Sequence, residues 1–297
     1  MKLFRITFLL GLFAAPLAAQ TPEEQVVAVV KRSFDAMRAK DTVAFRSALA
    51  PDARLIGTGT NQQGQPTYRA VGMGNFLASI ARSPQRLDER IFEPEVRIDQ
   101  NLATVWTRYE FWVDQNFSHC GYDAFQLIKT RGEWKIAQIA DTQRRVPEQC
   151  GRGTAPVKLP EPSKADTVAI IATLQSVFDG MKTKDTVALK QAFVPEGQLI
   201  GIQNETSDWH PLRADAWATQ LAQSQRPGEL IERMQNPEVR ISDNLATVWT
   251  WYDFHIGTRF SHCGIDAAQF VKTATGWKVV QITYTVRQSP CDRPGRN

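Results

Sequence analysis

The stretch EPEVRIDQNLATVWT at residues 93–107 returns as NPEVRISDNLATVWT at residues 236–250. FSHCGYDAFQ at 117–126 likewise returns as FSHCGIDAAQ at 260–269, again 143 residues later. Between 94–142 and 237–285 the ungapped match is 29 identities in 49 positions. The chain is therefore an internal duplication, so positions that both copies keep can be separated from positions that differ.

The beginning of the chain has the pattern of a secretory signal peptide. Lys2 and Arg5 precede the apolar run FLLGLFAA and the small-residue region PLAAQ. The apolar run is shorter than the about 20 residues that a membrane-spanning helix needs. We expect cleavage after Ala19 and a soluble mature chain, either periplasmic or secreted. The formal charge of +4 comes without a dense basic cluster, so no nucleic-acid partner is expected.

The segment GRGTAPVKLPEPSKA contains three Pro and two Gly and has no hydrophobic period, which is typical of a linker. The mature chain is long enough for two domains of ordinary size. We expect a signal peptide at 1–19, a first domain at 22–150, a linker at 151–165, a second domain at 166–291 and a tail at 292–297.

Each copy contains one early and one late cysteine, which favours two disulfides, Cys120–Cys150 and Cys263–Cys291. Four cysteines allow three pairings, and pairing within each copy is the one that a duplication preserves. The alternative is four buried free thiols. No C-x-x-C or H-x-x-x-H spacing occurs, so no zinc site is expected.

Each copy begins with an amphipathic helix that ends at KDTVA, where Asp41 or Asp185 can cap a second short helix. A short strand, a third helix and a four-stranded antiparallel meander follow, which is an α+β pattern. In the first copy we expect the short strand at 53–58, the third helix at 70–82 and the meander strands at 90–98, 102–113, 117–130 and 133–145. In the second copy the short strand and the third helix are expected at 197–202 and 213–224.

This pattern resembles the nuclear transport factor 2-like superfamily, and the residues ATVWTRYEF, FSHCGYDAFQLIKT and GEWKI resemble its SnoaL-like and lumazine-binding families. The resemblance covers nearly the whole mature chain. It implies two tandem cone domains, each with three helices packed on a curved, mostly antiparallel sheet, and a pocket between helices and sheet. Because the fold hosts enzymes and binding modules alike, it leaves the function open.

Polar residues in such a pocket are the candidates for chemistry: Asp123, Asp266, His119 and His262. A His–Asp dyad within one strand is not expected, because four residues span about 13 Å. With a turn at 114–116, Asp123 is expected opposite Arg108, and Asp266 opposite Trp251. An Asp beside a Trp in an apolar pocket is suited to act as a general base. The alternative for each Asp is a purely structural hydrogen bond to the backbone.

Candidate ligand-binding residues are aromatic or basic side chains near the expected pockets: Tyr109, Tyr252, Trp251, His255, Trp209, Arg69 and Arg213. The histidine of SHCG has an alternative, structural role beside a disulfide, with the following glycine permitting a bulge. In the second copy, Asp253, His255, His262 and Asp266 form the one set that resembles metal ligands. The first copy lacks the second histidine, so no metal is expected. No organic cofactor is expected either.

Three classes of function remain. The favoured one is a non-catalytic module that binds a small planar or aromatic molecule in one or both cones. The second is a cofactor-independent isomerase, dehydratase or hydrolase with Asp123 or Asp266 as its base. The third is a structural or interaction protein with filled cones. Domains of this fold often dimerise through the sheet, so a tandem copy is expected to supply that partner within the chain, as a pseudo-dimer.

Overall fold

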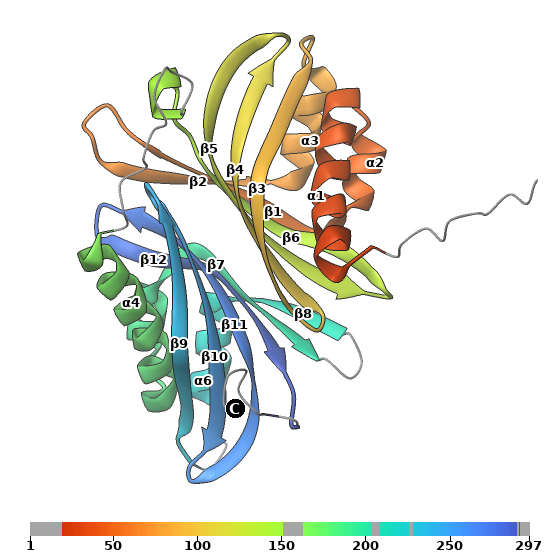
Figure 1. Ribbon diagram of the computed structural model, residues 1–297. Helices are drawn as coiled ribbons and strands as arrows, with labels where there is room; N and C mark the ends of the chain where they lie inside the picture. Colours follow the sequence, from red (N-terminus) through yellow and green to blue (C-terminus); the bar gives the residue numbers. More distant parts are fainter. Residues whose placement is uncertain (1–19, 151–162, 204–207, 226–227, 290, 292–297) are drawn as a thin grey trace, which may run out of the picture.

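The computed structural model describes residues 20–150, 163–203, 208–225, 228–289 and 291. The expected signal peptide, most of the linker and the tail lie outside these residues. The described chain forms two halves with the same order of helices and strands (Figure 1). Each half places helices on one six-stranded sheet, which confirms the expected tandem α+β fold.

The first half has a sheet with the strand order β2-β1-β6-β5-β4-β3, in which β1 and β6 are parallel and the other neighbours antiparallel. Its elements are α1 (Pro22–Ala39), α2 (Thr42–Ser47), β1 (Leu49–Thr60), β2 (Pro66–Gly72), α3 (Met73–Arg82), β3 (Leu87–Asp99), β4 (Leu102–Val113), β5 (Asn116–Thr130), β6 (Glu133–Thr142) and the short 3-10 helix η1 (Pro147–Cys150).

The second half repeats this order as β8-β7-β12-β11-β10-β9, with β7 and β12 parallel. Its elements are α4 (Lys164–Thr183), α5 (Thr186–Ala192), β7 (Phe193–Gln203), β8 (Asp208–Arg213), α6 (Ala214–Gln223), β9 (Leu230–Ser242), β10 (Leu245–Ile256), β11 (Arg259–Thr273) and β12 (Gly276–Val286). The strands β2 and β8 are additions to the expected pattern. Residues 66–72 pair with β1, so the helix expected at 70–82 begins at Met73.

The helix ends follow from local chemistry. The Thr21 hydroxyl accepts a hydrogen bond from the Glu24 N–H, and the Glu24 carboxylate accepts one from the Thr21 N–H, which forms a capping box. The Asp41 carboxylate accepts from two N–H groups at the start of α2, and Asp185 does the same for α5. The expected caps are therefore confirmed. Such a cap stabilises a helix by about 1 kcal/mol.

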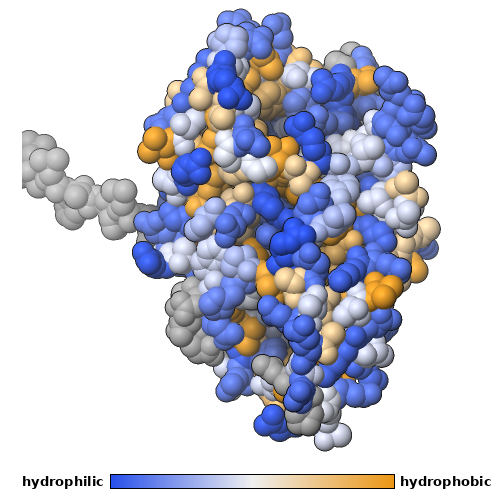
Figure 2. Space-filling model, turned by 180° about the vertical axis from the view of Figure 1, so that it is seen from behind, coloured by the Kyte–Doolittle hydropathy of each residue, from blue (hydrophilic) through white to orange (hydrophobic). Residues whose placement is uncertain are grey.

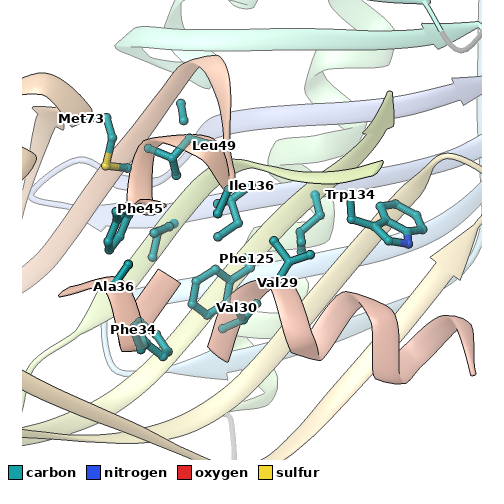
Figure 3. Close-up of a cluster of buried hydrophobic side chains, with 14 of the residues drawn as sticks. Val29, Val30, Phe34, Ala36, Phe45, Leu49, Met73, Phe125, Trp134 and Ile136 are labelled. Carbon is teal, nitrogen blue, oxygen red and sulfur yellow. The ribbon is translucent and has the colours of Figure 1, made fainter. Parts of the chain in front are cut away.

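The core of the first half lies between its helices and the concave face of the sheet (Figure 3). Phe34 of α1 meets Phe125 of β5 edge to face, with ring centroids 6.0 Å apart. Phe45 of α2 is 1% exposed in the same cluster. Burying each ring contributes about 2–3 kcal/mol, so this contact fixes the helices against the sheet. The second half has an equivalent core.

The expected register of the β4–β5 hairpin is wrong by one residue. Asp123 lies opposite Thr107 rather than Arg108, and Asp266 lies opposite Thr250 rather than Trp251. A β-bulge at Phe111/Trp112 adds one residue to β5 near the turn. Because successive side chains of a strand face opposite sides, this single residue exchanges the two faces of the sheet. The proposed Asp123–Arg108 salt bridge and the Asp266–Trp251 contact therefore do not form.

The two sheets pack against each other on the side opposite their helices, and the helices lie outside (Figure 1). Gln126 Nε2 donates to the Ala267 carbonyl at 2.7 Å, and Gln269 Nε2 donates to the Ala124 carbonyl at 2.9 Å. Gln269 is the counterpart of Gln126, and Ala267 is the counterpart of Ala124, so the duplication relates the two bonds. The tandem domains therefore form a pseudo-dimer within one chain.

Apolar clusters complete this interface, and one combines Leu102 and Ile128 with Ile200 and Ile265. The outer surface is different. On the face seen in Figure 2, hydrophobic residues appear in small areas among hydrophilic ones, because the apolar sheet faces are already covered. Among the described residues, no helix is both long and apolar enough to cross a bilayer.

Both expected disulfides are present, Cys120–Cys150 and Cys263–Cys291, and no described cysteine is free. Each ties the start of a central strand to the segment that follows the last strand of its domain. In Gly121, beside the first disulfide, a Cβ atom would lie 1.9 Å from the Thr142 carbonyl oxygen. Glycine is needed there because of this close approach, whereas the bulge lies at Phe111/Trp112.

Candidate functional site

Each curved sheet encloses a cavity together with its helices. The first cavity has a volume of about 590 Å³, and the second about 350 Å³. Their walls are mostly apolar and aromatic, which is typical of small-molecule sites. Aromatic wall residues are Phe34, Phe45, Phe76, Tyr109 and Phe111 in the first cavity, and Phe178, Trp217, Tyr252, Phe254 and Tyr284 in the second.

The corrected register places carboxyl groups on the cavity side of the first sheet. Asp123 of β5 lies directly opposite Asp141 of β6, and Glu89 of β3 lies opposite Phe111 of β4. All three carboxyl side chains line the same cavity. In the second domain, Glu232 and Asp266 occupy the positions of Glu89 and Asp123, and Tyr284 occupies the position of Asp141.

In the first cavity, Asp123 and Glu89 form a carboxyl pair. Asp123 is 1% exposed, and its Oδ2 accepts no hydrogen bond from an N–H or hydroxyl group of the described residues. Its side chain bonds to the Glu89 carboxyl instead, which requires a proton on one of the two. Burial raises the pKa of Glu89 to about 8 and that of Asp123 well above its usual range. The pair therefore shares a proton at neutral pH.

The second cavity has the equivalent pair of Asp266 and Glu232. Burial raises the pKa of Asp266 to about 7, and burial together with the negative charge of Asp266 raises the pKa of Glu232 well above its usual range. Asp266 Oδ2 is buried and likewise has no other partner among the described residues. A carboxyl pair that holds one proton between its two groups offers a ligand acceptor oxygens.

Tyr109 and Tyr252 line the cavities, but their hydroxyl groups already have partners. The Tyr109 hydroxyl donates to the Thr142 carbonyl at 2.7 Å, and the Tyr252 hydroxyl donates to the Thr285 carbonyl at 2.7 Å. Burial raises the pKa of both phenols well above their usual range. These side chains are therefore rigid walls that stay neutral.

His119 and His262 also line the cavities. The His119 ring stacks on Phe111 at 4.9 Å, and its Nδ1 bonds to the neighbouring Ser118 hydroxyl. Burial lowers the pKa of His119 to about 4 and also lowers that of His262, so both rings are neutral at pH 7. No hydrogen bond joins either ring to the Asp of its strand within the described residues, as the strand geometry predicts.

Four of the expected binding residues lie elsewhere. Trp209 and Trp251 pack between the domains, and Arg213 bonds to Asp215 on the surface. His255 lies 3.2 Å from Asp253, outside the second cavity, and this Asp bonds to Arg233. Arg69 lies at the rim of the first cavity. The register shift explains the difference for Trp251 and His255, because it turns both away from the cone.

The same shift separates the residues that resemble a metal site. Asp253 and His255 face one side of the β10–β11 hairpin, and His262 and Asp266 face the other. Within the described part of the chain, no group of three or more His, Cys, Asp or Glu side chains is arranged to hold a metal ion.

Sequence reasoning missed Asp141 and Tyr284 and left Glu89 and Glu232 without a role. A signal for the two glutamates was present in the sequence, because both copies keep Glu at this position. The signal for Asp141 was its replacement by Tyr in the second copy. Neither signal pairs a residue with Asp123, since that pairing depends on the bulge in β5.

Two of the solved structures that the chain is similar to each align with less than half of it. A protein of unknown function with a cystatin-like fold from Nostoc punctiforme PCC 73102 is 14% identical, with a TM-score of 0.35, over 42% of this chain and 93% of that one. A nuclear transport factor 2-like protein from Cytophaga hutchinsonii ATCC 33406 is also 14% identical, with a TM-score of 0.36, over 42% and 100%.

No curated protein matches the chain. A family model described as "Putative lumazine-binding" matches it twice, at residues 21–139 and 165–285. These segments contain both carboxyl pairs and both sets of helices. The chain therefore belongs to this family, with the family unit present twice in tandem.

Proposed function

We propose that the chain is an exported small-molecule-binding protein that holds a planar ligand in one or both cones. The observation that carries this proposal is the buried carboxyl pair at the base of an aromatic cavity, repeated in both domains. Flat aromatic walls suit a planar body, and the pair supplies a polar anchor with acceptor oxygens. Family membership supports the same class of function.

Export is supported by two observations. The first residues have the composition of a signal peptide, and both disulfides are of the kind that persists in oxidising compartments. We therefore place the mature protein in the periplasm or outside the cell.

Native mass spectrometry of protein purified from its own host tests the proposal. We expect a bound molecule that adds to the mass of the chain and is lost on denaturation. The fraction of protein that carries this molecule should fall in Asp123→Asn or Asp266→Asn. Thr219→Ala is the matched control, because Thr219 bonds to the backbone on the exposed side of α6. Empty protein in every preparation, with no thermal stabilisation by planar heterocycles, would refute the binding function.

A second candidate function is proton-transfer catalysis without a cofactor, favoured by the pKa of about 7 for Asp266. A carboxylate near that value is suited to take a proton from a bound carbon acid at neutral pH. Once a ligand is identified, exchange of its acidic hydrogens in D₂O distinguishes the two. Exchange that Asp266→Ala abolishes supports catalysis, and binding without exchange supports a binding module.

A further inference from the structure

The two cavities differ most at one position, which is Asp141 in the first domain and Tyr284 in the second. Both residues lie on the last strand, directly opposite the Asp of the carboxyl pair. We propose that Asp141 makes the first cone a site for a cationic ligand, a protonated amine on a flat apolar body, and that Tyr284 makes the second cone a smaller site for an uncharged ligand. This inference rests on the proposed binding function and deepens it.

The first cavity has an excess of acidic groups. Glu89, Asp123 and Asp141 reach it from three different strands, and like charges directly opposite each other destabilise a sheet. No described residue forms an ion pair with any of the three. Gln143 Nε2 donates to Asp141 Oδ2 at 3.3 Å, whereas Asp123 Oδ2 and Asp141 Oδ1 are buried and have no hydrogen-bond partner among the described residues. A cation with several N–H groups would supply the missing donors.

The basic groups around the cavity do not already serve as that cation. Arg69 on β2 lies at the rim and is exposed, and Arg145 follows β6 and is also exposed. Burial lowers the pKa of His119, and the positive charge of Arg145 lowers it further. Among the described residues that line the cavity, His119 is the other basic group, and it is neutral at pH 7. The acidic base of the cone is therefore left without a counterion.

The rest of the first cavity suits the body of such a ligand. Its volume of about 590 Å³ accommodates a bicyclic ring system, and phenylalanine rings from helices and sheet form the walls. Aromatic faces attract a cation by about 0.5–2 kcal/mol in addition to the carboxylates. Gly57 of β1 leaves space beside Asp141, since a Cβ there would lie 3.3 Å from Asp141 Oδ1.

In the second cavity, the neutral side chain of Tyr284 takes the position of the Asp141 carboxyl group. The Tyr284 hydroxyl lies 2.8 Å from where a Cβ of Gly201, the counterpart of Gly57, would be. The ring takes up the space in which Asp141 stands in the first domain, and the cavity is smaller, about 350 Å³. Burial raises the pKa of Tyr284 to about 12, so this group stays neutral. One carboxyl pair remains, with its shared proton.

The test is titration calorimetry of the full mature chain with 1-naphthylmethylamine and its neutral counterpart 1-naphthalenemethanol. We expect the amine to bind at least tenfold more tightly than the alcohol at one site. Binding should release protons at pH 7, because the ammonium group lowers the pKa of Glu89 from about 8 towards its usual value. Proton release is measured from the heats in two buffers of different ionisation enthalpy.

Asp141→Asn, which keeps the shape and removes the charge, should abolish the preference for the amine and the proton release. Asp52→Asn is the matched control, because it removes an exposed carboxylate of β1 that does not line the cavity, and it should change neither. Unchanged near-ultraviolet circular dichroism confirms that both variants are folded. Equal affinity for both probes would overturn the cation proposal and leave the binding function standing. Retained preference in Asp141→Asn would also overturn it. Absence of binding by both probes, beside a retained host molecule of another class, would refute the cation proposal alone.

Discussion

Asp266→Asn provides a direct test of the carboxyl pair through the stability of the protein. Asp266 is 2% exposed, and burial raises its pKa from 3.8 to about 7. The folded state therefore holds a proton that the unfolded state releases near pH 4. The stability associated with this proton is fully present below about pH 4 and is lost as the pH rises to about 7.

The size of this loss follows from the shift. A rise of about three pKa units corresponds to about 4 kcal/mol, since one unit is 1.36 kcal/mol. Asparagine is uncharged at every pH, and its amide can donate to the Glu232 carboxylate. Between pH 4 and pH 8, the free energy of unfolding of the variant should therefore fall by about 4 kcal/mol less than that of the natural protein. At pH 8 it should be the more stable of the two.

Urea unfolding at pH 4.5, 6 and 8, followed by far-ultraviolet circular dichroism, measures this difference. The control is Asp253→Asn, which removes a carboxylate that bonds to Arg233 and Gln235 on the other face of the same strand pair. It should lower the stability at pH 8 instead of raising it. Parallel pH profiles for the natural protein and Asp266→Asn would show that the folded protein holds no extra proton, and would refute the carboxyl pair.

Three further predictions concern the fold. Gly121→Ala should cost more than about 2 kcal/mol in urea unfolding, because its Cβ would meet the Thr142 oxygen at 1.9 Å, whereas Gly74→Ala on open α3 should be neutral or stabilising. Gln126→Leu removes the side-chain oxygen that accepts from the Gln281 amide and the Thr283 hydroxyl between the sheets, and it should lower the free energy of unfolding by about 1–3 kcal/mol; an unchanged denaturation midpoint would contradict the interface. Cys150→Ser opens a disulfide and should cost about 2–5 kcal/mol, a loss that reduction of the natural protein must reproduce.

Much of the fold could be predicted because its signals are local. The caps at Asp41 and Asp185 depend on a side chain and the N–H groups two and three residues later. The meander follows from alternating strands separated by turn residues. The turn between β3 and β4 places a positive φ at Gln100. β2 was missed because none of its seven residues is buried, so it has no core-facing side chains of the kind that mark a strand in a sequence.

The candidate site was only half predictable. Asp123, Asp266 and the two histidines line the cavities, and a functional role for them stays a prediction. Their partners depended on a register that one bulged residue shifts, so the contacts assigned to Arg108 and Trp251 were wrong. No pattern within a strand reveals a bulge in advance, because the extra residue is a property of the pair.

The duplication of one α+β unit can be read directly from the repeated sequence, and one cysteine pair in each copy predicts the two disulfides. Helix periodicity and cap chemistry are also readable, because they depend on residues a few positions apart. Which face of each strand points into the cone depends instead on the pairing of strands in three dimensions. That choice sends Gln126 and Gln269 to the interface between the domains, and it brings Glu89 to Asp123 and Glu232 to Asp266. The physical reason is that side chains alternate along a strand, so a single bulge exchanges the interior and the interface for every residue beyond it.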